Sequence, residues 1–460
     1  MEREKFSSRL GFILIAAGCA IGLGNVYRFP IITGAYGGGL FVLIYVAFLL
    51  LVGIPVMVAE LCVGRASRLS TAKSFEALES PGHKWHLVKY VMMAGNYLLM
   101  MFYTTIAGWM TIYFFKYASG SVSGIKSTEA MSQVFGNMVS NPGLLICSTL
   151  GVIVVCFAVC SLGLQKGVEK ITKVMMVALF VLIVIMAVRA CALPGALEGL
   201  KFYLVPSLEN VKDSGIITVI FAAMGQAFFT LSIGMGSIQI FGTYIDKERS
   251  LLGEAITITA LDTFVAIFSG LIIFPACFTY NGGVTADASS VGASFLFTTL
   301  SGLFNNMPGG RLWGTLFFLF MIFAAFSTVI AIFENIVAYW LELSKLSRRK
   351  IALLNIGIIA LLALPAIFSL NIWSDITIFG LGFLDLEDFT VSNIILPLGG
   401  LVFVLFCTTR YGWGWDNFIR EANEGKGMKF PKWIRPYMTY VLPVIILLVF
   451  LSSILKGYFS

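Results

Sequence analysis

The stretch Gly18-Cys19-Ala20-Ile21-Gly22-Leu23-Gly24-Asn25 lies in the middle of the first hydrophobic segment, which runs from Leu10 to Thr33. Three glycines and an asparagine interrupt a segment that is otherwise long and apolar enough to cross a bilayer. Backbone groups freed inside hydrocarbon are tolerated only where protein buries them or where they line a watery cavity. Close helix packing would explain a lone glycine, but the cluster with Asn25 favours a binding site at mid-membrane.

The composition indicates a helical protein that crosses a membrane many times. Of the 460 residues, 58% are hydrophobic and 12% are charged, which excludes an ordinary soluble domain. No small-residue cleavage site follows the first apolar segment, so we expect that segment to remain in the protein. The eight cysteines lie in or beside apolar segments without metal-ligand spacing. We therefore predict buried thiols rather than disulfides or a metal site.

The hydropathy pattern predicts eleven spans within a single domain, residues 1–460. The spans cover 10–33, 38–63, 87–117, 142–162, 170–192, 214–242, 251–280, 311–343, 350–372, 377–408 and 435–457. Of the basic residues between spans, 23 fall on the side of the N-terminus and seven on the other side. Because cytoplasmic loops carry the excess of Lys and Arg, we expect the N-terminus inside and the C-terminus outside. The net charge of +7 thus reports topology rather than nucleic-acid binding.

The sixth predicted span is interrupted like the first. It contains Thr230-Leu231-Ser232-Ile233-Gly234-Met235-Gly236. Broken helices at matching positions of two five-span halves are typical of secondary transporters with inverted repeats and a site between the breaks. We therefore predict repeats over 10–192 and 214–408, with an additional helix at 435–457. Half-helix N-termini suit a carboxylate and freed carbonyls suit a small cation, so we expect a zwitterion carried together with an ion.

Motifs in both halves resemble the neurotransmitter:sodium symporter family. They are Arg9-Leu10-Gly11, the run Gly18 to Pro30, Gly37-Gly38-Gly39, Gly53-Ile54-Pro55, Glu60, Gly64-Arg65, and Gln226 to Ser232 with Gly234 and Gly236. The likeness covers spans one to ten and is greatest to bacterial members with eleven spans that carry hydrophobic or aromatic amino acids. It implies a sodium-coupled importer of such L-amino acids, tyrosine first among them, in the bacterial inner membrane with a cytoplasmic N-terminus.

The resemblance also implies two sodium sites. The first would combine the substrate carboxylate with Ala20, Asn25, Thr230 and Asp262. Because the substrate supplies an oxygen there, the binding of the two would be interdependent. The second would use the carbonyls of Gly18, Ile21 and Ala324 and the hydroxyls of Ser327 and Thr328. Without the resemblance, these two hydroxyls would be expected to bond back to their own helix.

Asp262 departs from the family, which more often has Asn at this position. In chloride-dependent relatives, the positions matching Tyr45, Gln226, Thr230 and Ala266 hold the anion, but Ala266 lacks a hydroxyl. A carboxylate inside the membrane is costly and is normally functional or paired. Our hypothesis is that the charge of Asp262 replaces chloride and that Asp262 becomes protonated when the empty carrier returns. The alternative is a neutral Asp262 that bonds nearby hydroxyls.

The substrate contacts follow from the same resemblance. The amides near Leu23 and Gly24 and the Tyr103 hydroxyl would bind the carboxylate. The ammonium would meet the carbonyls of Ala20, Phe229 and Thr230 and the hydroxyl of Ser232. The side-chain pocket would be drawn from Cys19, Leu99, Tyr103, Phe229, Met235, Thr328, Val329 and Ile332. Such an apolar wall suits a large hydrophobic side chain, although Leu99, Val329 and Ile332 alone would be interpreted as core packing.

Two gates complete the prediction. On the outer side, Arg28 is expected to pair with Asp388, although Arg28 alone would be interpreted as snorkelling toward the interface. On the inner side, Arg3 is expected to pair with Glu342, with Tyr244 beside it. Glu60 matches a family carboxylate that steadies the breaks.

Other classes of protein fit less well. An enzyme would need a catalytic constellation, and the only two histidines, His83 and His86, lie in one predicted loop. A channel would need a continuous polar path rather than two isolated breaks. A membrane amino acid sensor with a transporter-like fold remains the alternative, because binding and transport share the same contacts.

Overall fold

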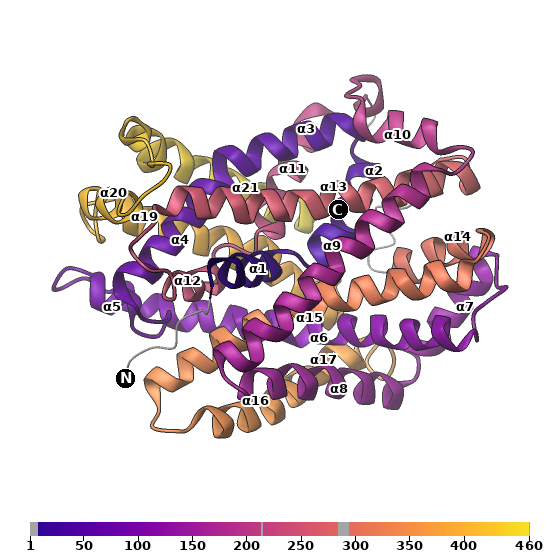
Figure 1. Ribbon diagram of the computed structural model, residues 1–460, viewed down its shortest axis with the longest axis horizontal. Coiled ribbons are helices and arrows are strands. Elements are labelled where there is room, and N and C mark those ends of the chain that lie inside the picture. Colours follow the sequence, from indigo (N-terminus) through magenta and orange to yellow (C-terminus); the bar gives the residue numbers. More distant parts are fainter. Residues whose placement is uncertain (1–7, 213–214, 284–293, 460) are drawn as a thin grey trace.

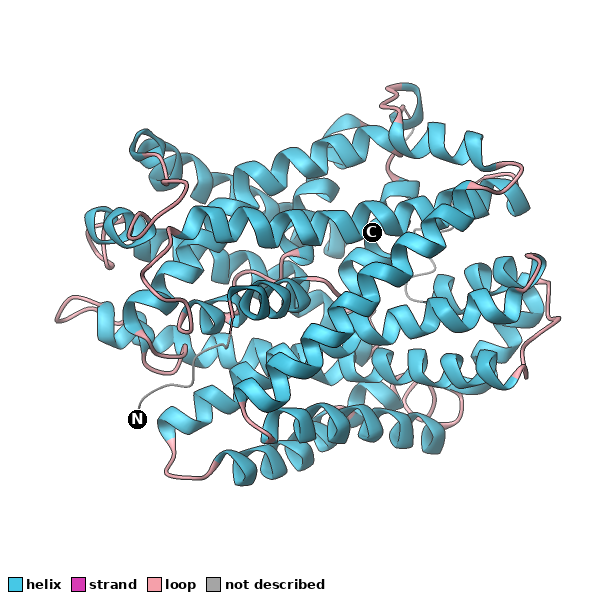
Figure 2. Ribbon diagram, in the orientation of Figure 1, coloured by secondary structure: helices cyan, strands magenta, loops and turns pink. Residues whose placement is uncertain are grey.

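The computed structural model describes residues 8–212, 215–283 and 294–459. Helices make up the architecture of these ranges (Figures 1 and 2), where β pairing is limited to isolated bridges. The all-helical fold that the composition predicts is therefore confirmed.

The first half of the chain contains α1 (Arg9–Ala20), η1 (Gly24–Arg28), α2 (Phe29–Ala35), α3 (Gly39–Phe48), η2 (Leu49–Gly53), α4 (Ile54–Ser67), α5 (Ser74–Leu78), η3 (Trp85–Leu87), α6 (Val88–Ser119), α7 (Thr128–Val139), α8 (Pro142–Ser161), η4 (Leu164–Glu169), α9 (Lys170–Cys191), α10 (Ala196–Leu204) and η5 (Glu209–Val211). The second half contains α11 (Ile216–Thr230), α12 (Ser237–Gly242), α13 (Leu251–Asn281), η7 (Leu296–Leu300), α14 (Ser301–Asn306), α15 (Gly310–Leu343), α16 (Arg348–Leu362), α17 (Leu364–Phe368), α18 (Phe383–Phe389), η8 (Thr390–Ile395), α19 (Leu396–Thr408), α20 (Trp415–Ala422), η9 (Lys432–Ile434), η10 (Tyr437–Val441) and α21 (Leu442–Phe459).

Nine helices of the described ranges are long and apolar enough to cross a membrane, and ten spans result if the bent pair at the N-terminus counts as one. In that pair, Arg9–Ala20 and Gly24–Ala35 meet at 58°. The short apolar helix α11 and its continuation α12 lie on either side of the second predicted break. Both breaks are thus confirmed, while the total of eleven spans stays a prediction.

Most predicted span boundaries agree with the helices to within a few residues. The fifth predicted span started at 170, but η4 and α9 form one continuous helix from Leu164. The ninth was predicted to end at 372 and the tenth to begin at 377, whereas the helices end at Phe368 and begin at Phe383. Phe379 and Gly380 explain the later start, because their φ angles of 54° and 79° are left-handed and do not continue a helix.

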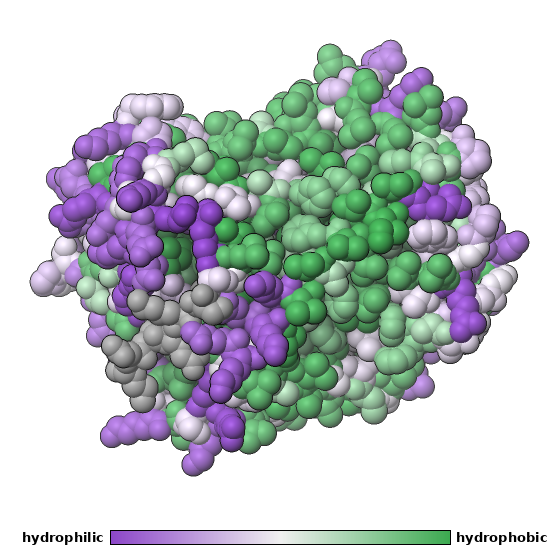
Figure 3. Space-filling view, viewed as in Figure 1, coloured by the Kyte–Doolittle hydropathy of each residue, from purple (hydrophilic) through white to green (hydrophobic). Residues whose placement is uncertain are grey.

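The surface agrees with a membrane-embedded bundle. Figure 3 shows a broad band of hydrophobic residues across the middle of the visible face, with hydrophilic residues gathered at its two ends. Many apolar side chains of α3, α9 and α21 are exposed on the bundle, including Leu43, Val181 and Leu448. Since an exposed apolar belt is costly in water, these helices are suited to face lipid.

Both breaks lie deep inside this bundle. The elements α1, α12 and α15 pack against one another, and α15 also packs along α6. The side chains that surround the two breaks are buried, among them Asn25, Glu60 and Asp262. Polar groups from three separate helical segments, η1, α4 and α13, are therefore buried inside an apolar protein.

Candidate functional site

Gly22 and Asn25 stabilise the first break. Helix α1 ends at Ala20, Ile21 after it is extended, and the side-chain oxygen of Asn25 accepts a hydrogen bond from the Gly22 amide at 3.0 Å. The Tyr103 hydroxyl accepts from the Leu23 amide at 3.1 Å. A Cβ on Gly22 would lie 2.4 Å from that hydroxyl, so only glycine allows the backbone to approach it. The break thus brings the Leu23 backbone amide against the predicted carboxylate-binding tyrosine.

The second break is made by left-handed residues. Gly234 and Gly236 have φ angles of 103° and 73°, which glycine tolerates, and Ser232 has a φ angle of 51° that is uncommon for a non-glycine residue. These positive values end the α-helical ladder. The buried carboxylate of Glu60 accepts hydrogen bonds from the amides of Gly234 and, at 3.3 Å, of Gln239. Glu60 on α4 therefore holds the second break, as its family match implies.

A small cavity lies between the two breaks. It has a volume of about 20 Å³ and is lined by Ala20, Gly22, Leu23, Gly24, Leu99, Tyr103, Phe229, Ser232, Met235, Thr328 and Leu396. Since this volume is about that of one water probe, the walls must move apart to admit an amino acid side chain. Phe229 packs closely, because a Cβ on Gly24 would lie 2.7 Å from its ring.

Three predicted pocket residues do not line this cavity. Cys19, Val329 and Ile332 are fully buried but are not among the residues that line it. Gly22 and Leu396 do line it, and the pocket prediction omitted both. Gly22 belongs to the glycine cluster that already marked the break, whereas no sequence signal distinguishes Leu396 from other apolar residues of its helix.

The structure brings together three of the four residues predicted for the first sodium site. The Asn25 side-chain amide donates to Asp262 Oδ1 at 2.7 Å and to Thr230 Oγ1 at 2.8 Å. The Thr230 hydroxyl donates to Asp262 Oδ2 at 3.2 Å. Ala20, the fourth residue, lines the adjacent cavity. This cluster joins the first break, the end of α11 and α13.

The residues predicted for the second sodium site also meet. The Thr328 hydroxyl lies 3.2 Å from the Gly18 carbonyl oxygen, 3.1 Å from that of Ile21 and 3.3 Å from that of Ala324. Ser327 donates to the Ala324 carbonyl at 2.9 Å. Back-bonding to their own helix, the alternative for these hydroxyls, is therefore present, but Thr328 in addition reaches two carbonyls of the first break. These contacts link five oxygens from two helices, and hydroxyl and carbonyl oxygens are a donor set that suits a small hard cation.

Two of the residues that match a chloride site contact the first break or Asp262. Gln226 donates its side-chain amide to the Gly24 carbonyl at 2.9 Å, and the Thr230 hydroxyl donates to Asp262 Oδ2 at 3.2 Å. Tyr45 and Ala266 are fully buried.

The outer gate residues lie close together. Arg28 Nη1 is 4.0 Å from Asp388 Oδ1 and donates to the Ser392 hydroxyl at 3.2 Å. Its guanidinium carbon stands 4.1 Å from the centre of the Phe229 ring. Arg28 thus covers the ring that closes the cavity, consistent with its predicted place in a gate.

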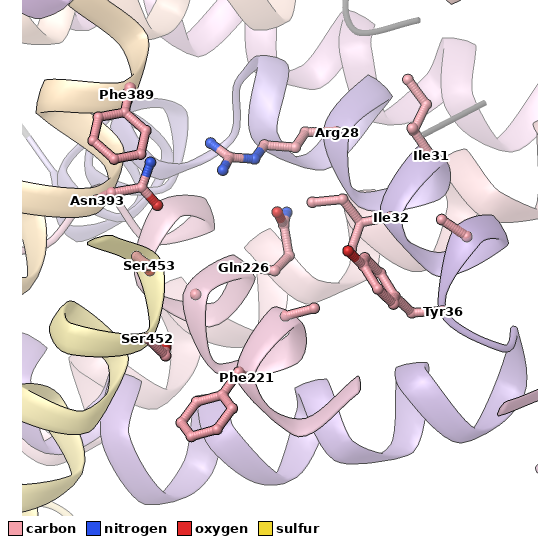
Figure 4. A pocket seen from close by; sticks show the side chains of 13 residues that line it. Arg28, Ile31, Ile32, Tyr36, Phe221, Gln226, Phe389, Asn393, Ser452 and Ser453 are labelled. Carbon is pink, nitrogen blue, oxygen red and sulfur yellow. The ribbon is translucent and has the colours of Figure 1, made fainter. Parts of the chain in front are cut away.

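A second, larger pocket opens beside Arg28. Its volume is about 330 Å³, and α2, α11, the α18–η8 region and α21 line it. Figure 4 shows the Arg28 guanidinium and the Gln226 amide directed into this pocket, with Asn393, Ser452 and Ser453 on the opposite side. This pocket leads from the surface of the bundle to the gate.

The pairing predicted for the inner gate stays a prediction. Arg3 lies outside the described residues. Glu342 accepts hydrogen bonds at 2.7 Å from both the amide and the hydroxyl of Ser70. Tyr244, predicted beside Glu342, donates to Glu334 at 3.2 Å.

Glu334 also pairs with Arg348, a contact that the sequence prediction missed. Arg348 begins α16 and Glu334 lies on α15, so the contact depends on how these two helices fold back on each other.

Two broken helices that face each other across a cavity inside a membrane bundle, with oxygen clusters on both sides, define a secondary transporter. A family model described as "Sodium:neurotransmitter symporter family" matches residues 3–130 and 125–458. The chain belongs to this family.

Similar proteins cover nearly the whole chain. The uncharacterized sodium-dependent transporter YhdH of Bacillus subtilis is 33% identical over 98% of this chain and 97% of its own length. The sodium-dependent serotonin transporter of Drosophila melanogaster is 26% identical over 99% of this chain and 77% of its own length. The crystal structure of MhsT in complex with L-phenylalanine has a TM-score of 0.86 at 35% identity and covers 98% of this chain and 100% of that one.

These findings confirm the family that the motifs indicated. The protein is a sodium-dependent transporter that crosses the membrane several times, and not an enzyme. The number of sodium ions and the substrate are finer questions, and the geometry of the site bears on both.

Proposed function

We propose that the protein imports hydrophobic and aromatic L-amino acids, tyrosine in particular, by sodium-coupled alternating access. The observation that carries the proposal is the layout around the first break. The Leu23 amide and the Tyr103 hydroxyl stand on one side, the Asn25–Thr230–Asp262 cluster on another, and an apolar cavity lies next to them. This layout suits the carboxylate, the coupling ion and the side chain of one zwitterion.

In this proposal sodium binds at two places. One ion is held by Ala20, Asn25, Thr230, Asp262 and the substrate carboxylate. The other is held by Gly18, Ile21, Ala324, Ser327 and Thr328. Sodium at the first place completes its coordination only with substrate, so each raises the affinity for the other. We further propose a bacterial inner membrane location with the N-terminus in the cytoplasm, two repeats over 10–192 and 214–408, and eleven spans.

The relatives support the substrate class. MhsT was crystallised with L-phenylalanine, and in this chain the cavity walls formed by Leu99, Phe229, Met235 and Leu396 are apolar. Met235 is a flexible thioether that can yield to an aromatic ring.

The test is uptake by the purified protein in proteoliposomes. We expect radiolabelled L-tyrosine, L-tryptophan and L-leucine to accumulate above the external concentration when an inward sodium gradient is imposed, and not with potassium in its place. Sodium-dependent binding without concentrative uptake would replace the proposal with a membrane sensor. No binding of any of the three would reject the substrate class.

We also propose that transport is independent of chloride, because Asp262 supplies the negative charge beside Thr230. The prediction is that uptake in a sodium gradient is unchanged, within about twofold, when gluconate replaces chloride. A collapse of wild-type uptake in gluconate would reject the role of Asp262 while leaving sodium coupling intact.

A further inference from the structure

Asn96 lies on α6 directly beyond the cavity. Tyr103 and Leu99 line the cavity from this helix, and Asn96, three residues before Leu99, continues the same helical face. Its side chain is fully buried. The amide donates to the carbonyl of Met235 at 3.0 Å and to that of Met92 at 2.7 Å. Asn96 therefore ties α6 to the backbone of the second break.

A second asparagine extends this tie to α15. The Asn335 amide donates to Asn96 Oδ1 at 3.1 Å, and Asn335 is also fully buried. The bond fixes the orientation of the Asn96 amide, because the oxygen of Asn96 must then face α15 and its nitrogen must face Met235. The pair thus joins α6, α15 and the break in one chain of hydrogen bonds.

Met235 needs an external anchor. It stands between Gly234 and Gly236, whose positive φ angles of 103° and 73° belong to a region that glycine enters freely. Its side chain lines the cavity, and its sulfur lies 3.5 Å from where a Cβ on Gly95 would stand. The position of the Met235 carbonyl therefore determines how far this part of the wall reaches into the cavity.

Packing alone does not explain two buried asparagines. A buried amide without partners costs free energy, whereas two apolar side chains of similar shape are nearly neutral in its place. Moreover, Asn335 Oδ1 has no hydrogen-bond partner among the described residues, so the pair does not satisfy its own polar atoms fully. A pair retained at such a cost is suited to fix the position of a neighbour.

We propose that Asn96, oriented by Asn335, is a positioning residue that sets the size of side chain the pocket accepts, through the Met235 carbonyl. This inference rests on the proposed function. Without the anchor, the Gly-Met-Gly segment relaxes and the wall becomes compliant. Discrimination between small and large side chains then weakens, while both ion clusters, which Asn96 does not join, keep their geometry.

The experiment measures sodium-dependent binding of L-phenylalanine and L-valine to the purified protein. In Asn96→Leu, which removes the donor but keeps the volume, we expect the ratio of the two dissociation constants to move toward one by about tenfold, the order of discrimination that a few methylenes provide. The sodium concentration for half-maximal binding should stay within about twofold of wild type, a readout that general loosening of the fold would shift.

Asn355→Ala is the matched control. Asn355 is also buried and bonds Tyr97, the neighbour of Asn96 on α6, so it reports the cost of losing a buried asparagine beside the same helix. We expect a lower thermal unfolding midpoint with an unchanged phenylalanine-to-valine ratio.

An unchanged ratio in Asn96→Leu overturns the inference. If Asn96→Leu does not fold, Asn335→Leu is the second variant, because it frees the Asn96 amide to turn. We expect it to shift the phenylalanine-to-valine ratio in the same direction by about threefold. No shift in Asn335→Leu overturns the inference as well. A wild-type protein that binds neither amino acid rejects the proposed function, and this inference with it. Wild-type binding with an unchanged ratio in both variants rejects only the inference.

Discussion

The two broken helices differ in the charge of the partners that their backbone groups meet. In the first break the partners are neutral: the Gly18 and Ile21 carbonyls face the Thr328 hydroxyl, and the Leu23 amide donates to the Tyr103 hydroxyl. In the second break, the amides of Gly234 and Gln239 donate to the Glu60 carboxylate.

This difference separates a part that exchanges ligands from a part that is held in place. Carbonyls that face a neutral hydroxyl are open to a cation, because the cation attracts them more strongly than the hydroxyl does. Amides that face a buried carboxylate already have a charged partner. We infer that the first break binds and releases ions, while the second supplies a fixed frame whose remaining freedom lies at Met235.

The largest expected effect comes from removing the fixed partner of the second break. In Glu60→Ala, two buried amides lose their acceptor at about 1–3 kcal/mol each. We expect a strong fall in the thermal unfolding midpoint of the purified protein and no measurable uptake. Glu60→Gln retains an acceptor oxygen, so its unfolding midpoint and its uptake should lie between those of wild type and Glu60→Ala. A normal midpoint in Glu60→Ala would show that the second break does not depend on the carboxylate.

Asp262 bonds residues of both breaks, so its charge tests their connection. A carboxylate about 4 Å from a sodium ion contributes about 4 kcal/mol at an effective dielectric constant of 20. Allowing for solvent and relaxation, we expect Asp262→Asn to raise the sodium concentration for half-maximal uptake by about 100-fold.

The same variant should respond to chloride, because the anion then has a place beside Thr230. We expect Asp262→Asn to take up more substrate in chloride than in gluconate at the same sodium concentration. Equal sodium dependence of Asp262→Asn and wild type would favour the alternative of a neutral, hydrogen-bonded Asp262.

Thr328 tests the first break alone. Thr328→Val keeps the shape but removes the oxygen that faces the Gly18 and Ile21 carbonyls. We expect the lost ligand oxygen to contribute about 1.4 kcal/mol to sodium binding. This corresponds to a tenfold rise in the sodium concentration for half-maximal uptake. Ser327→Ala is the neighbouring comparison, and a similar or smaller rise is expected because its hydroxyl bonds the Ala324 carbonyl. An unchanged sodium requirement in both variants would remove the second sodium site from the proposal.

The sequence predicted both breaks because glycine, serine and asparagine are conspicuous in an apolar segment. Hydropathy likewise predicts the first and last residues of most membrane-spanning helices to within a few residues. The start of the tenth span was wrong because a left-handed turn at Phe379 carries an apolar side chain, and hydropathy does not register backbone direction. The sequence was thus sufficient to predict a helix break wherever polar residues and the change of backbone conformation occur at the same positions.

The walls of the cavity were harder to predict than its polar contacts. Polar partners such as Tyr103 and Thr328 are few, so a family resemblance locates them. Val329 and Leu396 are both apolar residues of predicted spans, and only the packing of α15 and α19 decides that Leu396 lines the cavity while Val329 does not. The Asn96–Asn335 bond depends in the same way on the closeness of two helices that are 239 positions apart in sequence.

The smallest expected effect lies outside both breaks, at the outer gate. Arg28 and Asp388 are partly exposed, with 23% and 35% of their side-chain surface accessible, and exposed ion pairs contribute about 0–1 kcal/mol. We therefore expect Asp388→Asn to change the KM for uptake by less than about fivefold. Arg28→Ala should have a larger effect than Asp388→Asn, since Arg28 also covers the Phe229 ring, and Arg28→Lys should lie between them. If Asp388→Asn abolishes uptake, the outer gate is as rigidly held as the second break, and the division between fixed and exchanging parts of the protein is wrong.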